Sequence, residues 1–297
     1  MILRKLIQKI PGITAGVQSR FIHHPRRACL YVPGDDERKL NKIKSLKNVD
    51  CLILDTEDGV AQNRKDVARE TILKFLSSTD KSILPSTDWA VRINSVESKL
   101  FQDDIKSLKS VLSTIFLPKV ESVVDLQKFG ETLAENPGNN ERKLIFYVES
   151  CQSIMNLPEI CKAAKDFGER YKFLPVGIVF GSDDFVADLG AGKSDSSQEI
   201  MYARQRVVLC AKAFKWQAID MVNINLNDDD GLRKQSLEGA LMGYTGKQVI
   251  HPKQIEIVQT AFLPNERKVK WAEGLLKSYE EHQKSGKVTC DVMKRRK

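Results

Sequence analysis

Two carboxylate residues close apolar runs of the chain, at positions where metal ions are often held. The run at residues 144–149 ends in Glu149, and the run at 176–184 ends in Asp184. Apolar runs of this length, bounded by turn residues, are typical of strands buried on both faces of a parallel sheet. Carboxylate oxygens at the C-terminal ends of such strands suit a hard divalent cation. We therefore predict that Glu149 and Asp184 are metal ligands in a metal-assisted enzyme.

Further short apolar runs bring the number of strand candidates to eight. They cover residues 28–32, 51–54, 89–93, 115–117, 218–222 and 248–250. Amphipathic stretches lie between most of them, at residues 37–47, 65–77, 101–111, 123–133, 153–167, 198–214 and 230–243. Strands that alternate with helices form right-handed βαβ units, and eight of them predict an α/β fold, the closed (β/α)₈ TIM barrel, with its active site at the C-terminal strand ends. An open doubly wound sheet shows the same alternation and is the alternative.

The length and the cysteine content fit one barrel in a reducing compartment. A chain of 297 residues accommodates a barrel of ~250 residues with small extensions, and we place the barrel at residues 28–263. The six cysteines form no Cys-x-x-Cys pair, and only four histidines are present. These counts favour reduced thiols over disulfides or zinc, and oxygen-ligated Mg²⁺ over a transition metal.

The net charge of +8 is concentrated at the two ends of the chain. Residues 1–27 carry six basic residues and no acid, and residues 287–297 carry five basic residues against Asp291, which leaves the body at −2. A nucleic-acid partner is therefore disfavoured, because the charge does not belong to the predicted barrel. No run reaches the ~18 apolar residues of a membrane span, so no membrane partner is expected.

Residues 1–27 combine apolar residues at helical spacing with basic and small residues. The apolar positions are Leu3, Leu6, Ile7 and Ile10. This pattern is typical of a mitochondrial transit peptide, and the mitochondrial matrix is the predicted location. A disordered basic arm is the alternative. We expect the mature chain to begin between Arg20 and Ala28.

The segment at residues 187–194 is similar to a phosphate-binding P-loop, but two features argue against that function. Ala187 stands where the first glycine is required, and aspartates at positions 183, 184, 188 and 195 surround the segment. Anions do not collect among like charges. We therefore interpret the segment as a βα loop that follows a metal-ligand strand.

Seven ordered motifs resemble those of the citrate lyase β-subunit family, and the resemblance covers about residues 26–285. They lie at residues 27–37, 54–60, 91–95, 117–121, 148–150, 180–185 and 246–252. The resemblance implies a Mg²⁺-dependent TIM barrel, usually a homotrimer, that cleaves or forms a carbon–carbon bond between an acyl-CoA and a 2-oxo acid. Within the family it implies cleavage of citramalyl-CoA to acetyl-CoA and pyruvate, with a malate-synthase-like side activity.

The resemblance also implies roles for the residues that carry the chemistry. Glu149 and Asp184 would hold Mg²⁺, with water and the carboxylate and hydroxyl of the substrate completing an octahedron. Arg92 would be the catalytic residue that binds and polarises the thioester carbonyl, where negative charge develops as the enolate forms. A structural ion pair with a barrel carboxylate is the alternative for Arg92. Glu57 and Asp58 would orient metal-bound water.

The remaining implied roles concern binding of the CoA portion of the substrate. Tyr31, Arg38 and Lys42 would contact CoA, and the last two share a helix face because they are four residues apart. Relatives carry lysine where Arg38 stands, which keeps the charge; a solvated helix face is the alternative. Ile250 and His251 would contact CoA mainly through their backbone, unless Pro252 merely sets a turn there. Lys119 would neutralise the acidic rim.

The end of the chain departs from the family pattern. Relatives continue past the helix that corresponds to residues 265–285 into a lid with a Gly-x-Met-Ile-Asp-x-Pro motif, whose aspartate acts as an acid/base. Here the residues after Gly286 do not match, and Asp291 is given no role. We expect residues 264–297 to form a C-terminal helix and a divergent, truncated tail. A catalytically impaired protein that binds Mg²⁺ and CoA is the corresponding alternative.

Two other classes of protein fit parts of the sequence. A class II-type aldolase would use the same barrel and metal on a free 2-oxo acid, without CoA. A basic RNA-binding module would keep salt-dependent binding after deletion of both ends, which the charge of −2 on the body disfavours.

Overall fold

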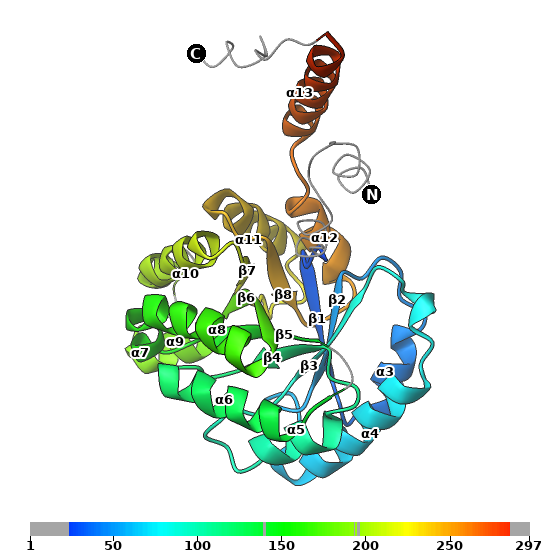
Figure 1. The fold of residues 1–297 in the computed structure, drawn as a ribbon, viewed down its shortest axis with the longest axis vertical. Coiled ribbons are helices and arrows are strands. Elements are labelled where there is room, and N and C mark those ends of the chain that lie inside the picture. The colour runs from blue at the N-terminus through cyan, green and yellow to red at the C-terminus, as the bar shows by residue number, and fades with distance from the viewer. Residues whose placement is uncertain (1–23, 139–140, 193, 195–196, 286–297) are drawn as a thin grey trace.

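Eight parallel strands close into a barrel in the order of the sequence, as the alternating pattern predicts (Figure 1). The computed structural model describes residues 24–138, 141–192, 194 and 197–285. Pairing of β1 with β8, in which Ala28 lies opposite Lys247, closes the barrel and excludes the open sheet. The strands are β1 (Ala28–Pro33), β2 (Cys51–Asp55), β3 (Asp88–Arg92), β4 (Thr114–Leu117), β5 (Arg142–Val148), β6 (Phe173–Phe180), β7 (Gln217–Asp220) and β8 (Gly246–Val249).

Helices surround the barrel, and the last helix projects away from it (Figure 1). They are α3 (Glu37–Ile43), α4 (Lys65–Ser78), α5 (Phe101–Leu108), α6 (Val123–Glu135), α7 (Cys151–Met155), α8 (Leu157–Tyr171), α9 (Ser182–Leu189), α10 (Met201–Ala213), α11 (Asp229–Met242), α12 (Gln254–Ala261) and α13 (Glu266–Ser285). Three single-turn 3₁₀ helices lie at Gln62–Arg64, Lys81–Ile83 and Gln198–Ile200. Among the described residues, no helix is both long and apolar enough to span a bilayer.

Side chains on the strands divide into two buried layers, because successive residues of a strand point to opposite faces. A small cluster fills the inside of the barrel and consists of Cys29, Cys51, Ile53, Ala90, Phe116, Ile145, Tyr147, Val179 and Ile219. A much larger cluster packs the outer faces of the strands against the helices. Strands covered on both faces are almost wholly apolar, which explains the continuous apolar runs of the sequence.

Two sequence predictions for this part of the chain are wrong in detail. The strand expected at residues 176–184 ends at Phe180, and Asp184 lies in the first turn of α9. The loop expected from residue 187 onward begins only after this helix, which ends at Gly190 with a φ of +68°. Glycine adopts this left-handed conformation without steric cost, so Gly190 ends the helix.

The helix expected at residues 153–167 is divided, and two helices, α9 and α12, are missing from the prediction. Asn156 ends α7, and α8 begins directly afterwards with Pro158 in its first turn, where the missing N–H of proline costs nothing. Helix α12 follows the turn at Pro252. Its eight residues are too few for a clear helical period.

Five cysteines of the described chain are free thiols, in agreement with the expectation of reduced cysteines. Cys29, Cys51 and Cys161 are buried, whereas Cys151 and Cys210 are partly exposed. Cys290 lies outside the described residues, as do the divergent tail after Ser285 and residues 1–23 of the predicted transit peptide.

The last residues of the predicted targeting segment are built into the bottom of the barrel. The Arg26 side chain is 3% exposed and donates to Asp88 Oδ2 at 2.7 Å and to Gln217 Oε1 at 2.6 Å. Both partners begin strands, and the carbonyl of Arg27 accepts from the N–H of Lys247 on β8 at 2.8 Å. Arg26 therefore joins β3 and β7 at the N-terminal end of the barrel, and Arg27 adds the contact to β8.

We predict that a chain beginning at His24 is more stable than one beginning at Ala28. Loss of Arg26 leaves Asp88 buried without its cation, which typically costs about 3–5 kcal/mol. Urea denaturation of the two chains measures this difference, and the full chain with Arg26→Ala should show most of the same loss. Equal unfolding free energies for the two shortened chains would contradict the structural role of Arg26.

Candidate active site at the barrel mouth

The register of the parallel strands brings four polar side chains together at the C-terminal end of the barrel. Asp55 and Arg92 are direct partners on β2 and β3. Tyr31 on β1 and Tyr147 on β5 reach the same place, and their hydroxyl groups form a short hydrogen bond. Burial raises the pKa of both phenols well above the usual value, so they stay protonated.

Arg92 lies at the centre of this group and is fixed by two carboxylates. Its Nε donates to Asp55 Oδ1 at 2.7 Å, its Nη2 donates to Asp55 Oδ2, and its Nη1 lies 2.9 Å from Glu57 Oε2. The guanidinium carbon lies 5.2 Å from the centre of the Tyr31 ring. Burial alone would lower the pKa of Arg92, but Asp55 and Glu57 raise it well above its usual value. Arg92 is therefore a permanent, oriented cation.

The structure also contains the ion pair that was the alternative interpretation of Arg92. Arg92 can form this ion pair and also bind a substrate oxygen, because a guanidinium has five N–H donors and the two carboxylates occupy only some of them. Its side chain is 14% exposed, so the group is not sealed from the mouth of the barrel. Asp55 holds the fork of Arg92, and the remaining N–H groups are available to an oxygen of a ligand.

A buried polar network lies beneath this layer and fixes the loops after β2 and β3. Lys65 Nζ donates to the carbonyls of Thr56 and Glu57 at 2.8 and 2.7 Å. Asp104 accepts from the N–H and the side-chain amide of Asn94, both at 2.7 Å, and from the Thr56 hydroxyl at 3.1 Å. Neither loop can shift without breaking several buried hydrogen bonds, so the network holds Glu57 and Arg92 in position.

Glu149 follows β5 directly and points into the same mouth. Tyr147 lies two residues earlier in the chain, on the same inward face. One Glu149 oxygen, Oε1, accepts from the backbone N–H of Lys119 at 2.6 Å. Burial, together with the nearby negative charge of Asp184, raises the pKa of Glu149 to about 8. An added cation would therefore favour the ionised form of this carboxyl group.

Asp184 reaches the mouth from helix α9, and a helix cap fixes this helix relative to Glu149. Asp188, one turn further along α9, accepts at 2.6 Å from the N–H of Cys151, the first residue of α7. The N–H of Gly181 donates to the carbonyl of Val148 at 3.1 Å. A Cβ at Gly181 would collide with Glu149 Oε2, so glycine leaves room for this carboxylate beside α9.

The two predicted metal ligands fit a magnesium ion, provided that water and substrate complete its shell. Among the residues that the structure describes, no group of three or more His, Cys, Asp or Glu side chains is arranged to hold a metal. Both residues offer carboxylate oxygens, and the negative charge of Asp184 beside Glu149 favours a cation there. Mg²⁺ typically keeps several waters and is held by one or two carboxylates, so two protein ligands are enough.

Lys119 links the two halves of the site. Its Nζ lies 3.0 Å from Glu57 Oε1, 3.7 Å from Asp58 Oδ1 and 4.0 Å from Asp184 Oδ2. Burial lowers its pKa, but the carboxylates, Glu57 first, raise it above the usual value. The expected neutralisation of the acidic rim by Lys119 is therefore present. Arg92, Glu57, Lys119 and Asp184 form a continuous chain of alternating charges.

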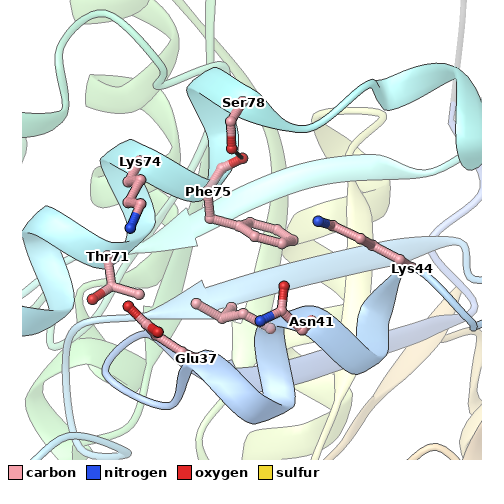
Figure 2. Close-up of a pocket in the computed structure, with 8 residues that line it drawn as sticks. Glu37, Asn41, Lys44, Thr71, Lys74, Phe75 and Ser78 are labelled. Atoms are coloured by element: carbon pink, nitrogen blue, oxygen red, sulfur yellow. Dashed lines mark hydrogen bonds between the residues drawn. The ribbon is translucent and has the colours of Figure 1, made fainter.

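The predicted CoA-binding residues on α3 lie apart from this cluster. Arg38 and Lys42 are exposed, and no described contact joins them to Arg92. A hollow of about 170 Å³ lies between α3 and α4 (Figure 2). It is lined by Glu37, Leu40, Asn41, Lys44, Thr71, Lys74, Phe75 and Ser78. Arg38 and Lys42 do not line it, so they occupy a different face of α3.

The loop after β8 has its backbone donors occupied. The N–H groups of Ile250 and His251 both donate to Gln254 Oε1, at 2.9 and 3.2 Å. The Gln254 amide in turn donates to the carbonyl of Asn223 at 2.9 Å. If the backbone of this loop contacts CoA, it therefore does so through carbonyl oxygens, unless Gln254 moves and frees the N–H groups. The exposed side chains of Ile250 and His251 remain accessible.

Sequence reasoning missed three groups of functional residues. Asp55 lies in a motif that we singled out, but its pairing with Arg92 depends on strand register. Tyr147 has the period-two spacing to Glu149 that places both on the inner face. No local signal identifies Lys65, Asn94 and Asp104 as one network, because their hydrogen bonds connect segments far apart in the chain.

The chain is similar in sequence to proteins of known function. Residues 27–252 match the model of the family described as HpcH/HpaI aldolase/citrate lyase. The mitochondrial citramalyl-CoA lyase of Homo sapiens is 44% identical over 95% of this chain and 84% of that protein. The family match covers the chain from the start of β1 to the turn after β8.

Solved structures with the same architecture contain magnesium. The citrate lyase β subunit of Mycobacterium tuberculosis, complexed with oxaloacetate and magnesium, is 27% identical with a TM-score of 0.67, and the match covers 82% of this chain and 98% of that one. CitE from the same organism, in complex with magnesium, acetoacetate and coenzyme A, is 26% identical with a TM-score of 0.67, and the match covers 86% and 87% of the two chains.

We predict that the buried network beneath the site depends on Asp104 far more than on Asp66, although both carboxylates bind Arg69. The Asp104 side chain is fully buried and lies 2.9 Å from Arg69 Nη1, whereas the Asp66 side chain is 86% exposed. Asp104→Ala should lower the unfolding free energy by about 3–5 kcal/mol, because it takes the acceptor from buried donors of Thr56, Asn94 and Arg69 and leaves this cation only the exposed Asp66. The matched control Asp66→Ala should cost about 1 kcal/mol or less. Chemical denaturation distinguishes the two, and similar losses would contradict the assignment.

Proposed function

Because the chain belongs to the HpcH/HpaI aldolase/citrate lyase family, we propose that it is a Mg²⁺-dependent lyase that cleaves citramalyl-CoA to acetyl-CoA and pyruvate. The observation that carries the proposal is that Arg92 and the two proposed metal ligands lie at one rim of the barrel, connected by ion pairs and a hydrogen bond. Glu57 contacts Arg92 and Lys119, and Lys119 contacts Asp184 and, through its N–H, Glu149. A fixed guanidinium and two cation-binding carboxylates are the groups that an enolate-forming carbon–carbon cleavage needs. The relative from Homo sapiens supports the choice of substrate.

The residues of the site would divide the work of this reaction. A bound Mg²⁺ would supply Lewis-acid polarisation of the tertiary hydroxyl and of the ketone that it becomes. Glu149 and Asp184 would hold the ion. A base would take the proton of the hydroxyl group, the carbon–carbon bond would break, and pyruvate would form. The electron pair of the broken bond would be left on the acetyl-CoA fragment as an enolate. The free N–H groups of Arg92 would stabilise the enolate oxygen until a proton is returned to carbon.

Arg92 would act on the transition state because its position is fixed in advance. Asp55 holds the guanidinium plane by two hydrogen bonds, and Asp55 itself accepts from the N–H groups of Glu57 and Gly59, both at 2.9 Å. A donor that is already oriented costs no reorganisation when charge develops on the thioester oxygen. The same site run in the other direction on glyoxylate would give malyl-CoA, which is the basis of the proposed malate-synthase-like side activity.

Tyr31, Arg38, Lys42, Ile250 and His251 are proposed to bind the CoA portion. The strand and helix that carry the first three are consecutive, and α3 starts directly after the C-terminal end of β1, at the same rim as Arg92. The complex of the Mycobacterium tuberculosis protein with coenzyme A supports an acyl-CoA ligand for this fold. Location in the mitochondrion is supported by the mitochondrial relative, and the matrix and the homotrimer stay predictions.

The direct test is an assay of citramalyl-CoA cleavage with pyruvate as the detected product. We expect turnover with Mg²⁺ and loss of turnover when EDTA removes the ion. Full activity in EDTA would overturn the metal-dependent mechanism. Cleavage of a free hydroxy acid, with no response to CoA thioesters, would instead support the aldolase alternative.

We predict that Glu149→Gln and Asp184→Asn each abolish the thermal stabilisation of the protein by Mg²⁺. A ligand at 100 times its dissociation constant stabilises a protein by about 2.7 kcal/mol, and each variant removes one of two charged ligands without removing core volume. Glu159→Gln is the matched control, because Glu159 is an exposed carboxylate in the first turn of α8. Unchanged Mg²⁺ titrations in both ligand variants would remove the assignment.

We predict that Arg92→Lys lowers turnover by on the order of 10²–10³-fold, the usual effect of losing one oxyanion donor. Affinity for a CoA thioester should change only a few-fold, because CoA binding is proposed to depend on other residues. A lysine ammonium cannot reproduce the planar fork that Asp55 holds. Steady-state kinetics together with calorimetric binding of CoA separate the two effects. Loss of CoA binding with normal turnover would reverse the proposed role.

A further inference from the structure

Lys119 contributes to the site in two separate ways, through its backbone and through its side chain. It follows Pro118 at the end of β4 and has a φ of +56°, a conformation that is uncommon for residues other than glycine. In this conformation its N–H donates to Glu149 Oε1 at 2.6 Å. Its ammonium group points to a different set of carboxylates, those of Glu57, Asp58 and Asp184.

The ammonium stands where the rim has a surplus of negative charge. Glu57, Asp58, Glu149 and Asp184 meet there, and Arg92 is occupied by Asp55 and Glu57. Among the described ion pairs, Lys119 supplies the positive charge that reaches Asp184, at 4.0 Å. Its side chain is 43% exposed, so it can swing away into solvent without leaving a cavity.

We infer that Lys119 is a built-in counter-cation that competes with Mg²⁺ for the Asp184 carboxylate. The inference rests on the proposed metal ligands Glu149 and Asp184. In the metal-free protein the ammonium holds the acidic rim together, and when Mg²⁺ binds it gives up Asp184 and keeps Glu57. The backbone N–H keeps its hydrogen bond to Glu149 in both states, so one oxygen of that ligand is oriented before the ion arrives.

The direction of the effect follows from the charges. A monovalent and a divalent cation that share a carboxylate repel each other, so the ammonium must weaken Mg²⁺ binding. It also reduces the mutual repulsion of the carboxylates when no metal is bound. Lys119 thus lowers the affinity for the ion and raises the stability of the empty site. A residue that only positioned Glu149 and Asp184 would instead raise the affinity of the site for Mg²⁺.

Lys119→Gly separates the two contributions of the residue. Glycine adopts the positive φ and keeps the N–H that binds Glu149, whereas the ammonium is lost. Lys172→Gly is the matched control, because Lys172 is an exposed lysine with a φ of 62° at the C-terminal end of α8. It reports the effect of a glycine substitution at a positive φ, together with the loss of one exposed hydrogen bond from Lys172 Nζ to the carbonyl of Glu169. Lys119→Met is a second variant that removes the charge and keeps most of the volume.

We expect calorimetry to give about tenfold tighter Mg²⁺ binding for Lys119→Gly and Lys119→Met than for the wild type, with no change for Lys172→Gly. The melting temperature without metal should be lower for Lys119→Gly than for Lys172→Gly. Equal or weaker Mg²⁺ binding in both Lys119 variants would overturn the inference while leaving the metal site in place. Absence of Mg²⁺ binding in the wild type would instead overturn the proposed function, and the inference with it.

Discussion

The arrangement of the barrel mouth depends on the paired hydrogen bonds between Asp55 and Arg92. A guanidinium this deeply buried is tolerated only beside a carboxylate, because burial by itself disfavours the charge. The adjacency is produced by the register of β2 and β3. Asp55 also accepts from two N–H groups of the loop that follows it, and this loop carries Glu57. One carboxylate therefore sets both the orientation of the central cation and the path of the next acidic segment.

From the Asp55–Arg92 pair, positively and negatively charged side chains alternate across the mouth of the barrel. Glu57 contacts both Arg92 and Lys119, and Lys119 reaches Asp184 through its side chain and Glu149 through its backbone. Each member is neutralised by neighbours from other segments of the barrel mouth, so the charges remain ordered in a partly buried environment. This arrangement also separates two proposed functions. Arg92, which would bind the thioester oxygen, lies at one end of the row of contacts, and the carboxylates that would bind the metal lie at the other end.

The sequence predicts the barrel well and the site in part, and the reasons are local. Glu149 directly follows the apolar run of β5 at residues 144–148, so its place at the rim is readable from residues 144–149 alone. Asp184 is harder, because the apolar run ends at Phe180 and only Gly181 separates β6 from the first turn of α9, which carries Asp184. The Asp55 pair and the left-handed Lys119 cannot be read from the chain. The first depends on register between strands, and the second on a backbone angle that no residue type announces.

The seam between β1 and β8 sets a condition on how this chain acquires its structure. Ala28 pairs with Lys247, and the carbonyl of Arg27 accepts a hydrogen bond from the same lysine. One edge of the first strand thus remains unpaired until almost the entire barrel has been synthesised. Contacts between such distant parts of a chain form slowly, because a long loop must be ordered before they are made. Final closure is therefore a late step, and a chain halted before β8 would expose two unpaired strand edges to aggregation.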